Sequence, residues 1–452
     1  MTKKTKVAVI GMGYVGIPAA ALIADVDGFE VVGIQRHSER SGWKIDALNK
    51  GKCPILNEPD LPGLIKRVVL EKKTFHVTDD TDVLKDMDYI LIDVQTPTDK
   101  ETHEPLYRSL REVSAIVGKK MKDGVVVAVE STVAPGTTEF IVKPILEENS
   151  GKKVGEDFHL VFAYERVMVG RLINNIVNYP RIIGGITEEC TQKGLWLYKH
   201  IVKEELIPVN ATTAEVAKVV ENTYRDVQIA FANEVALACE SMNVNFNDVR
   251  RCVNSLPFNS NAYRDLHLPG AGVGGHCLPK DPWLLKYGVD TYGKGKVPFD
   301  VIIKARMRND MMPSHMLNLV KEATKKAGID FSKAKIAVLG ASFIENSEDT
   351  RNSPTVDFIE LLEKEGVHWK IHDPLVRPRE FPYPVSKDLD EIVKDSSVVV
   401  LFVKHQEYYK IEPKWLKDKM AHAIIIDGRD VFNLQEFRQR GFITFGLGKP
   451  NH

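Results

Sequence analysis

A short buried strand followed at once by a glycine-rich turn is the feature that most limits how this chain can fold. Residues 6–10 read as a buried parallel strand, and Gly11, Gly13 and Gly16 follow in the pattern GxGxxG before an alanine-rich helix. The first glycine permits the tight turn, the second lets a pyrophosphate reach the backbone, and the third lets helix and strand pack closely. This opening predicts a dinucleotide-binding α/β domain; the alternative is a glycine-rich turn without a ligand.

The end of the second strand, residues 31–34, departs from the usual pattern. An acidic residue normally follows this strand and holds the adenosine ribose of NAD. Gln35 and Arg36 stand there instead. The Gln35 amide can still bond a ribose hydroxyl, and Arg36 could accept the 2′-phosphate of NADP. We therefore predict NAD as the cofactor, with NADP not excluded.

The length and charge of the chain limit its domain organisation and its partners. A chain of 452 residues is too long for one hydrophobic core, so two or three domains are expected. The 61 basic and 62 acidic side chains leave a net charge of -1, which argues against a nucleic-acid partner. The five cysteines contain no CxxC pair, so we expect no metal site and a reducing, cytoplasmic setting. The chain has no apolar run long enough to span a membrane.

Polar clusters follow three further predicted strands, residues 89–92, 125–129 and 160–163. Ligands of doubly wound sheets bind at the carboxyl ends of the strands, so a shared cleft is expected there, although single members could be turn or cap residues. The clusters are Gln95-Thr96-Pro97, Glu130-Ser131-Thr132 and Tyr164-Glu165-Arg166.

A long helix without glycine or proline is predicted from residue 211 to residue 242. Lys218 and Asn222 lie four residues apart and share a face, which Ile229 and Asn233 continue. These polar side chains stand on a face otherwise suited to burial, although a solvated face is the alternative. A helix of this length suits a spine between domains and a dimer interface.

One thiol lies in an unusual setting further along the chain. Cys277 stands between the pair Gly274-Gly275 and a Pro-Lys-Asp step that includes Lys280. Glycines permit close approach of the backbone to a ligand, and a nearby lysine favours the nucleophilic thiolate. The alternative is a loop with an ordinary buried cysteine. A second α/β unit begins at residues 335–340 and lacks GxGxxG, so we expect it to bind a different ligand.

A dinucleotide site and an activated cysteine together suggest oxidation through a covalent thioester. The cysteine would trap an aldehyde as a thiohemiacetal, and water would later hydrolyse the acyl-enzyme. Lys218 or backbone amides would stabilise the oxyanion. The hydrolysis step needs polar groups near water, for which the candidates are Glu165, Asp281 and Thr132.

The chain resembles the UDP-glucose/GDP-mannose dehydrogenase family, the nucleotide-sugar 6-dehydrogenases, over nearly its full length. This resemblance implies two successive NAD-dependent oxidations that convert a sugar C6 alcohol into a uronic acid. The matching stretches are Gly11-Met12-Gly13-Tyr14-Val15-Gly16, Ser131-Thr132-Val133-Ala134-Pro135-Gly136-Thr137-Thr138, the helix with Lys218, Asn222 and Asn233-Glu234, Gly274-Gly275-His276-Cys277-Leu278-Pro279-Lys280-Asp281, and Asp349-Thr350-Arg351-Asn352-Ser353-Pro354.

The resemblance also implies roles for matching residues. Cys277 would be the nucleophile and Lys218 the oxyanion stabiliser; Asn222 and Asp281 would position substrate and water, and Glu165 and Thr132 would assist hydrolysis. The implied cofactor residues are Gly11, Met12, Gly13, Tyr14, Val15, Gly16, Gln35, Arg36, Thr96, Pro97, Thr132 and Arg351. The implied substrate residues are Glu165, Arg166, Val167, Lys218, Asn222, Arg264, Gly272, Gly275, His276 and Arg351.

The implied architecture is α/β, with two Rossmann-like doubly wound parallel-sheet domains joined by a long central helix and a small all-helical middle domain. The expected boundaries are 1–208 for NAD binding, 209–315 for the helical domain with the catalytic Lys and Cys and for dimerisation, and 316–452 for the UDP-sugar. A homodimer or larger homo-oligomer that supplies uronic acids for polysaccharide biosynthesis is expected.

The substrate is predicted from two short stretches. Glu165-Arg166-Val167-Met168 and Gly275-His276-Cys277 resemble the branch acting on UDP-N-acetylhexosamines, notably UDP-N-acetyl-D-mannosamine. Arg166 and His276 could donate to an N-acetyl carbonyl. Ile344 replaces a lysine common before the Asp-x-Arg motif, so one substrate contact is in doubt.

Three alternatives remain open at this point. A UDP-glucose or GDP-mannose 6-dehydrogenase would share the motifs. A two-electron dehydrogenase of the hydroxyacid or 6-phosphogluconate type would use Lys218 and Asn222 but leave Cys277 without a role. A catalytically silent nucleotide-sugar sensor is supported only by the departures at Gln35 and Ile344.

Overall fold

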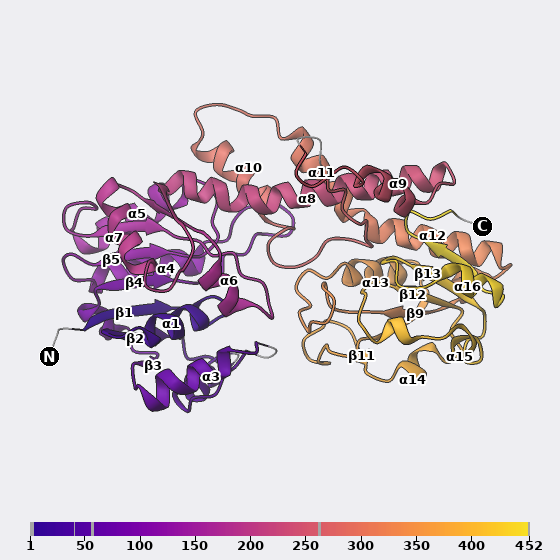
Figure 1. The fold of residues 1–452 in the computed structure, drawn as a ribbon, viewed down its shortest axis with the longest axis horizontal. Coiled ribbons are helices and arrows are strands. Elements are labelled where there is room, and N and C mark those ends of the chain that lie inside the picture. Colours follow the sequence, from indigo (N-terminus) through magenta and orange to yellow (C-terminus); the bar gives the residue numbers. More distant parts are fainter. Residues whose placement is uncertain (1–3, 40, 56–57, 261–263, 451–452) are drawn as a thin grey trace. The chain divides into compact units, whose positions relative to one another are not determined.

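The computed structural model describes residues 4–39, 41–55, 58–260 and 264–450. Contacts divide the chain into two compact units, each built around one β-sheet (Figure 1). The first unit comprises Met1–Glu221 and Trp283–Val297, and the second comprises Asn222–Pro282 and Pro298–His452. The three-domain division expected from the sequence stays a prediction.

The sheet of the first unit has the strand order β3-β2-β1-β4-β5-β6-β7-β8. The first strand therefore lies inside the sheet and the chain winds outward in both directions, which is the doubly wound arrangement. Every pairing is parallel except β6 with β7, where Val161 lies opposite Gly185 in antiparallel register. The strands are β1 (Thr5–Ile10), β2 (Phe29–Ile34), β3 (Phe75–Thr78), β4 (Tyr89–Ile92), β5 (Val126–Val129), β6 (His159–Phe162), β7 (Arg181–Gly185) and β8 (Leu206–Asn210).

Both faces of this sheet are buried. Val7 and Ala128 join one core cluster together with side chains of α1, α3, α6 and α7, while the alternating residues Ala8 and Val127 are fully buried on the other face. The helical segments are α1 (Gly16–Asp25), α2 (Trp43–Asn49), α3 (Leu61–Lys66), η1 (Arg67–Glu71), η2 (Thr81–Asp86), α4 (Arg108–Lys120), η3 (Thr138–Val142), α5 (Lys143–Ser150), α6 (Leu172–Asn178) and α7 (Glu188–Tyr198).

The glycine-rich turn after β1 is held by contacts that exclude side chains. Gly11 has φ +109°, and a Cβ there would lie 2.2 Å from the Asp93 carbonyl oxygen. A Cβ on Gly16 would lie 2.0 Å from the carbonyl oxygen of Gly11. These two positions require glycine because the turn must pass close to β4 and then to itself.

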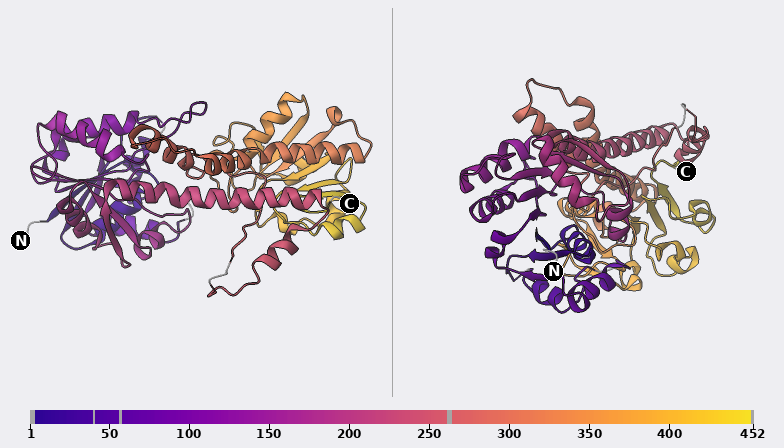
Figure 2. Two further views of the ribbon diagram at one scale, coloured as in Figure 1. Left: turned by 90° about the horizontal axis from the view of Figure 1, so that it is seen from above. Right: turned by 60° about the vertical axis from the view of Figure 1, so that its left-hand side comes forward.

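The helix α8 (Ala211–Ser241) is 31 residues long and contains neither glycine nor proline. It runs without a break, as Figure 2 shows. The division between the two units falls within it, after Glu221. The long helix expected from the sequence is therefore present.

The sheet of the second unit has the order β11-β10-β9-β12-β13-β14, with all pairings parallel. Ile336 and Val338 of β9 pack with α12 and α13, whereas Ala337 and Leu339 pack with α14, α15 and α16. This is a second Rossmann-like sheet with helices on both faces (Figure 1). The strands are β9 (Lys335–Leu339), β10 (His368–His372), β11 (Val385–Ser386), β12 (Val398–Leu401), β13 (Ile424–Asp427) and β14 (Ile443–Gly446).

The remaining helical segments are α9 (Phe246–Val253), α10 (Asp281–Tyr292), α11 (Asp300–Asp310), α12 (Met312–Lys326), η4 (Phe331–Lys333), α13 (Pro354–Lys364), α14 (Leu389–Val393), η5 (Tyr408–Lys410), α15 (Pro413–Lys417) and α16 (Leu434–Gln439). Among the described residues, no helix combines the length and the apolar character needed to cross a bilayer.

Candidate active site

The glycine-rich turn presents an open surface suited to a dinucleotide. A Cβ on Gly13 would have no described atom within 4 Å, so a pyrophosphate can approach this backbone directly. The Met12 amide donates to Oε1 of Gln35 over 3.1 Å, and the Lys44 ammonium donates to the Met12 carbonyl oxygen over 3.0 Å. The turn is thus fixed from two sides, and its residues fit NAD.

The ends of β4 and β5 are joined by hydroxyl groups. Thr96 Oγ1 donates to the carbonyl oxygen of Thr132 over 2.6 Å, and Ser131 Oγ donates to that of Val94 over 2.7 Å. The predicted cofactor residues Thr96, Thr132 and Pro97 therefore lie at neighbouring strand ends, as the parallel topology requires. The hydroxyls of Thr96 and Ser131 thus donate to backbone carbonyl groups, and these hydrogen bonds hold Thr132 in position.

A buried charge cluster lies at the same strand ends. Glu130 accepts from the Tyr198 hydroxyl over 2.6 Å and from the Arg181 guanidinium. Burial and the neighbouring Glu130 carboxylate raise the pKa of Asp93 well above its ordinary value. Among described atoms, one oxygen of Asp93 and one of Glu130 are buried without a donor, so a proton on Asp93 would satisfy both.

Lys218 reaches back from α8 to the loop after β6. Its ammonium donates to the carbonyl oxygen of Glu165 over 2.7 Å and lies 3.8 Å from a carboxylate oxygen of the same residue. It also lies 5.1 Å from the centre of the Tyr164 ring. The lysine is buried in this setting, which holds its charge close to Glu165.

Arg166 is engaged by its own chain. Its guanidinium pairs with Glu221 of α8 and donates to the Pro180 carbonyl oxygen over 2.8 Å. Tyr164 donates to the same Glu221 over 2.8 Å. The Val167 amide donates to the Glu165 carboxylate. The predicted substrate stretch 165–167 is therefore tied to α8 through Glu221, a residue that the sequence did not single out.

Cys277 lies at the amino end of α10. Its carbonyl oxygen accepts from the amides of Lys280 over 3.1 Å and Asp281 over 2.9 Å, which forms the turn that leads into the helix. The positive end of a helix dipole favours an anionic thiolate. Burial, with the charges of Lys280 and Arg351, lowers the pKa of the adjacent His276 to about 4, so this imidazole is neutral at pH 7.

Asp281 is a fully buried carboxylate held from two sides. Asn222 Nδ2 donates to Oδ2 over 2.6 Å, and the Lys280 ammonium pairs with Oδ1 over 2.8 Å. The Lys280 charge is therefore matched by Asp281. Lys218 precedes Asn222 by one turn of α8.

The glycines around the cysteine pack against the loop 343–354. A Cβ on Gly275, which has φ +90°, would lie 2.7 Å from the Phe343 ring, and one on Gly272 would lie 2.5 Å from Pro354. The Gly275 amide donates to the Arg351 carbonyl oxygen over 2.9 Å, and Asn352 Nδ2 donates to the Gly275 carbonyl oxygen over 3.0 Å. The space that the missing side chains of these glycines leave is therefore occupied by other parts of the protein.

Arg351 also has a partner in its own motif. Its guanidinium forms a forked pair with the Asp349 carboxylate, with Nε 2.9 Å from Oδ1. Arg264, another predicted substrate residue, lies on the exposed loop that follows the residues outside the described ranges. Asn233, which continues the Lys218 face, is buried between Asn309 and the Gly270 amide and has a structural role.

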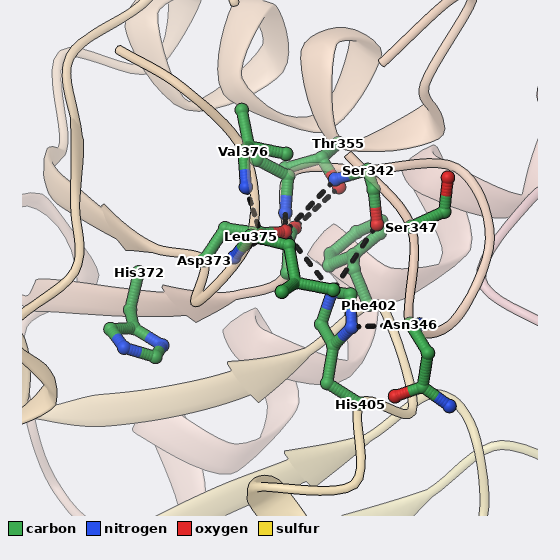
Figure 3. Close-up of polar contacts among 12 residues, drawn as sticks. Ser342, Asn346, Ser347, Thr355, His372, Asp373, Leu375, Val376, Phe402 and His405 are labelled. Atoms are coloured by element: carbon green, nitrogen blue, oxygen red, sulfur yellow. Dashed lines mark hydrogen bonds and ion pairs between the residues drawn. The ribbon is translucent and has the colours of Figure 1, made fainter. Parts of the chain in front are cut away.

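In the second Rossmann-like unit, a carboxylate of the protein itself binds the backbone amides of the turn after β9 (Figure 3). Asp373 follows β10 and accepts from the amides of Ala341 over 2.7 Å and Ser342 over 3.1 Å, which follow β9. His405 Nδ1 accepts the Asn346 amide, so its proton is on Nε2, which donates to Asp373 over 3.1 Å. Burial raises the pKa of Asp373, but these hydrogen bonds prevail and lower it to about 2. This explains why the unit lacks the glycine fingerprint.

The described part of the chain brings together no group of three or more His, Cys, Asp or Glu side chains suited to a metal ion. A Rossmann sheet with an open glycine turn, and a cysteine at a helix amino terminus, are the parts of an NAD-dependent oxidoreductase. The comparisons with known proteins narrow this class.

Sequence models of one family match three parts of the chain: its NAD-binding domain at residues 5–202, its central domain at 212–311 and its UDP-binding domain at 337–434. The chain belongs to the UDP-glucose/GDP-mannose dehydrogenase family and is an NAD-dependent nucleotide-sugar 6-dehydrogenase. The family, the α/β fold and the NAD cofactor expected from the sequence are confirmed.

Individual relatives are similar over nearly their full length. The UDP-N-acetyl-D-mannosamine dehydrogenase of Pyrococcus horikoshii is 36% identical, with 98% of this chain and 99% of the relative covered. The solved NDP-N-acetyl-D-galactosaminuronic acid dehydrogenase of Methanosarcina mazei Go1 is 42% identical at TM-score 0.90, covering 100% and 96%. The solved UDP-D-ManNAc dehydrogenase of Pyrococcus horikoshii is 36% identical at TM-score 0.89, covering 99% and 100%.

Proposed function

We propose that the enzyme oxidises the C6 alcohol of UDP-N-acetyl-D-mannosamine to the uronic acid in two steps, through a covalent intermediate on Cys277. The observation that carries this proposal is the position of Cys277 in the turn that leads into α10, where its carbonyl oxygen accepts from the amide of the buried Asp281. A helix amino terminus favours the thiolate that the intermediate requires. NAD, when bound, accepts the hydride in each oxidation.

The chain's own residues would handle the carbon and the protons. After the first oxidation, the Cys277 sulfur adds to the C6 aldehyde, and the aldehyde oxygen becomes the hydroxyl of a thiohemiacetal. The second oxidation removes the hydride from C6 and the hydroxyl proton, which leaves a thioester. Water then adds to the thioester carbonyl, the C–S bond breaks, and the sulfur regains a proton while the sugar leaves as a carboxylate.

Lys218 would stabilise the oxyanion at C6, because a buried ammonium, here held in place by the Glu165 carbonyl oxygen, interacts strongly with developing negative charge. Asp281 and Asn222 would orient water or substrate, since Asn222 fixes the carboxylate. Glu165 and Thr132 would assist hydrolysis. Val167, Arg264, Gly272, Gly275 and His276 remain proposed substrate residues. Arg166 and Arg351, already paired with carboxylates, would shape the site through those pairs.

An N-acetyl-D-galactosamine nucleotide is the second candidate substrate, because the Methanosarcina mazei relative is the more identical of the two solved structures described above. The test follows absorbance at 340 nm with purified enzyme, NAD and nucleotide sugars that include both N-acetylated hexosamines, UDP-glucose and GDP-mannose. We expect two NADH per UDP-N-acetyl-D-mannosamine. The variant Cys277→Ser should stop acid formation, while Cys252→Ser, an exposed thiol on α9, should not.

Other outcomes would overturn the proposal. One NADH per sugar with an aldehyde product would indicate a two-electron enzyme. Binding without any NADH across the panel would indicate a sensor. Preference for another sugar would replace the mannosamine assignment and leave the Cys277 chemistry standing.

We further propose a homodimer that pairs through α8. Three exposed apolar side chains recur on one side of this helix: Val220, Tyr224 and Phe231, at 41%, 64% and 63% exposure. Their spacings of 4 and 7 residues keep them on one helical face. A stripe of this kind is typical of a protein interface. A cytoplasmic location and the absence of nucleic-acid or membrane partners remain predictions from charge and cysteine spacing.

A further inference from the structure

The end of β2 contains an amide where nucleotide sites for NAD usually contain a carboxylate. That carboxylate binds the ribose diol and would repel a 2′-phosphate. Gln35 is uncharged, and its side chain is fixed in one orientation. Its Oε1 accepts from the Met12 amide over 3.1 Å, while Nε2 donates to Ser41 Oγ over 3.1 Å and to the Arg36 carbonyl oxygen over 3.3 Å.

Two hydroxyl groups gather beside this amide. Ser38 Oγ and Ser41 Oγ lie 2.8 Å apart, and the Ser41 amide donates to Ser38 Oγ over 3.2 Å. The turn after β2 therefore presents two serine hydroxyls next to Gln35. One of these hydroxyls donates to the other, so the pair leaves one hydroxyl proton that can donate to a phosphate oxygen.

Two described cationic side chains, Arg36 and Lys44, belong to the same region. Arg36 follows Gln35 and is exposed, and Lys44 brings its ammonium from α2 to within 3.0 Å of the Met12 carbonyl oxygen. In sequence, residues 35–44 contain Arg36, Arg40 and Lys44 and one acidic residue, Glu39, which is exposed. Asp79 and Asp80, which follow the neighbouring β3, are exposed as well.

We propose that this subsite accepts the 2′-phosphate of NADP+, so that the enzyme uses NADP+ in addition to the NAD+ of its family. Arg36 forms the forked hydrogen bonds to the phosphate, as guanidinium groups do. One serine hydroxyl supplies a further donor, and Lys44 supplies further positive charge. Gln35 contributes by being neutral, because an acidic residue there would oppose the phosphate. The inference goes beyond the established cofactor and does not depend on which sugar is oxidised.

Nucleotide fragments test the subsite without any turnover. Isothermal titration of the full chain compares adenosine 5′-monophosphate with adenosine 2′,5′-bisphosphate, which differ only in the 2′-phosphate. We expect the bisphosphate to bind at least about tenfold more tightly, the gain of one charge-assisted contact. Arg36→Ala should abolish that gain and leave binding of the monophosphate unchanged. Lys4→Ala, an exposed lysine paired with Glu30 at the amino end of the same sheet, should keep the gain.

A second variant tests the neutral amide. Gln35→Glu keeps the acceptor for the Met12 amide but adds a negative charge, so the bisphosphate should lose at least about tenfold in affinity while the monophosphate does not. Equal affinity of the native chain for both nucleotides, or equal losses in the Arg36 and Lys4 variants, would overturn the proposal. Since no sugar is present, either failure leaves the proposed oxidation of the UDP-sugar untouched.

Discussion

Asn222 Nδ2 donates a hydrogen bond over 2.6 Å to Oδ2 of Asp281, whose other oxygen pairs with the Lys280 ammonium. Asp281 is fully buried and the Lys280 side chain is 6% exposed. Two polar side chains, of which Lys280 is buried, thus hold one buried carboxylate. Each of them would be destabilising if its partner were removed.

Asp281→Asn should therefore destabilise the fold. The substitution leaves the Lys280 ammonium buried without a counter-charge, and the loss of one member of a buried pair costs about 3–5 kcal/mol. The urea midpoint followed by tryptophan fluorescence should fall accordingly. Lys286→Ala breaks the exposed pair of Lys286 with Asp290 on the same helix and should leave the free energy of unfolding within about 0.5 kcal/mol of that of the native chain. Equal losses of stability in the two variants would show that the buried ion pair contributes no more than the exposed one.

Gly275→Ala should impair the cysteine loop but not the cofactor site. Gly275 has φ +90°, and a methyl group there would meet the Phe343 ring at 2.7 Å. Backbone strain alone costs about 1–2 kcal/mol for a side chain in the left-handed region. We expect acid formation to fall more than about tenfold while binding of adenosine 5′-monophosphate, measured by titration, is unchanged. Gly295→Ala, where a Cβ has no described atom within 4 Å, is the matched control. An unchanged turnover in the Gly275 variant would contradict the role of this packing.

The sheets were predictable from local pattern, because runs such as Val398–Leu401 are buried on both faces and therefore uniformly apolar. Edge strands escaped prediction: β8 carries Pro208, which lacks an amide donor and is tolerated only at an edge. The antiparallel direction of β7 could not be predicted from the sequence either, because the direction of a strand in a sheet depends on partners that are distant along the chain.

Within the proposed site, the roles of the residues remain predictions, and sequence patterns did not reveal the partners that their side chains have in the fold. Arg166 was expected to meet an N-acetyl group, yet its guanidinium pairs with Glu221, 55 positions away. Lys280 was expected to act on the thiol, and it pairs with Asp281. The tertiary fold decides which groups form ion pairs, because a nearby carboxylate on another element competes with a ligand for the same cationic side chain. Motif spacing cannot show that competition.

Charge placed on the α8 stripe should separate the proposed dimer. Phe231 is 63% exposed, and Phe231→Asp puts a carboxylate into a face that a partner would dehydrate, which is strongly unfavourable. Light scattering behind size exclusion should give twice the 50.8 kDa chain mass for the native protein and a single chain mass for the variant. Arg225→Ala, whose position is about 120° around α8 from Phe231, should stay dimeric. A native protein that elutes as a monomer would refute the interface.

Glu215 makes the junction between α8 and the loop 131–138 sensitive to pH. Its carboxylate is fully buried and accepts from the amides of Gly136 over 2.6 Å and Thr138 over 2.7 Å, and from the Thr138 hydroxyl. Burial raises the pKa of Glu215 from 4.5 to about 7, against the hydrogen bonds, which lower it. The folded chain therefore holds a proton that the unfolded chain releases between these two pH values.

Because the pKa of Glu215 is higher in the folded state, the stability it contributes is complete below pH 4.5 and is lost as the pH rises through about 7. The free energy of unfolding should fall by up to about 3 kcal/mol across that window on account of this group. In Glu215→Gln the side chain cannot titrate, so this part of the slope should vanish, although the loss of an acceptor lowers stability by about 1–3 kcal/mol at every pH. Urea unfolding at intervals between pH 5 and pH 8 measures both effects. Glu148→Gln, an exposed carboxylate on α5, should retain the native slope, and a Glu215 variant with that same slope would show that the buried carboxylate titrates outside this range.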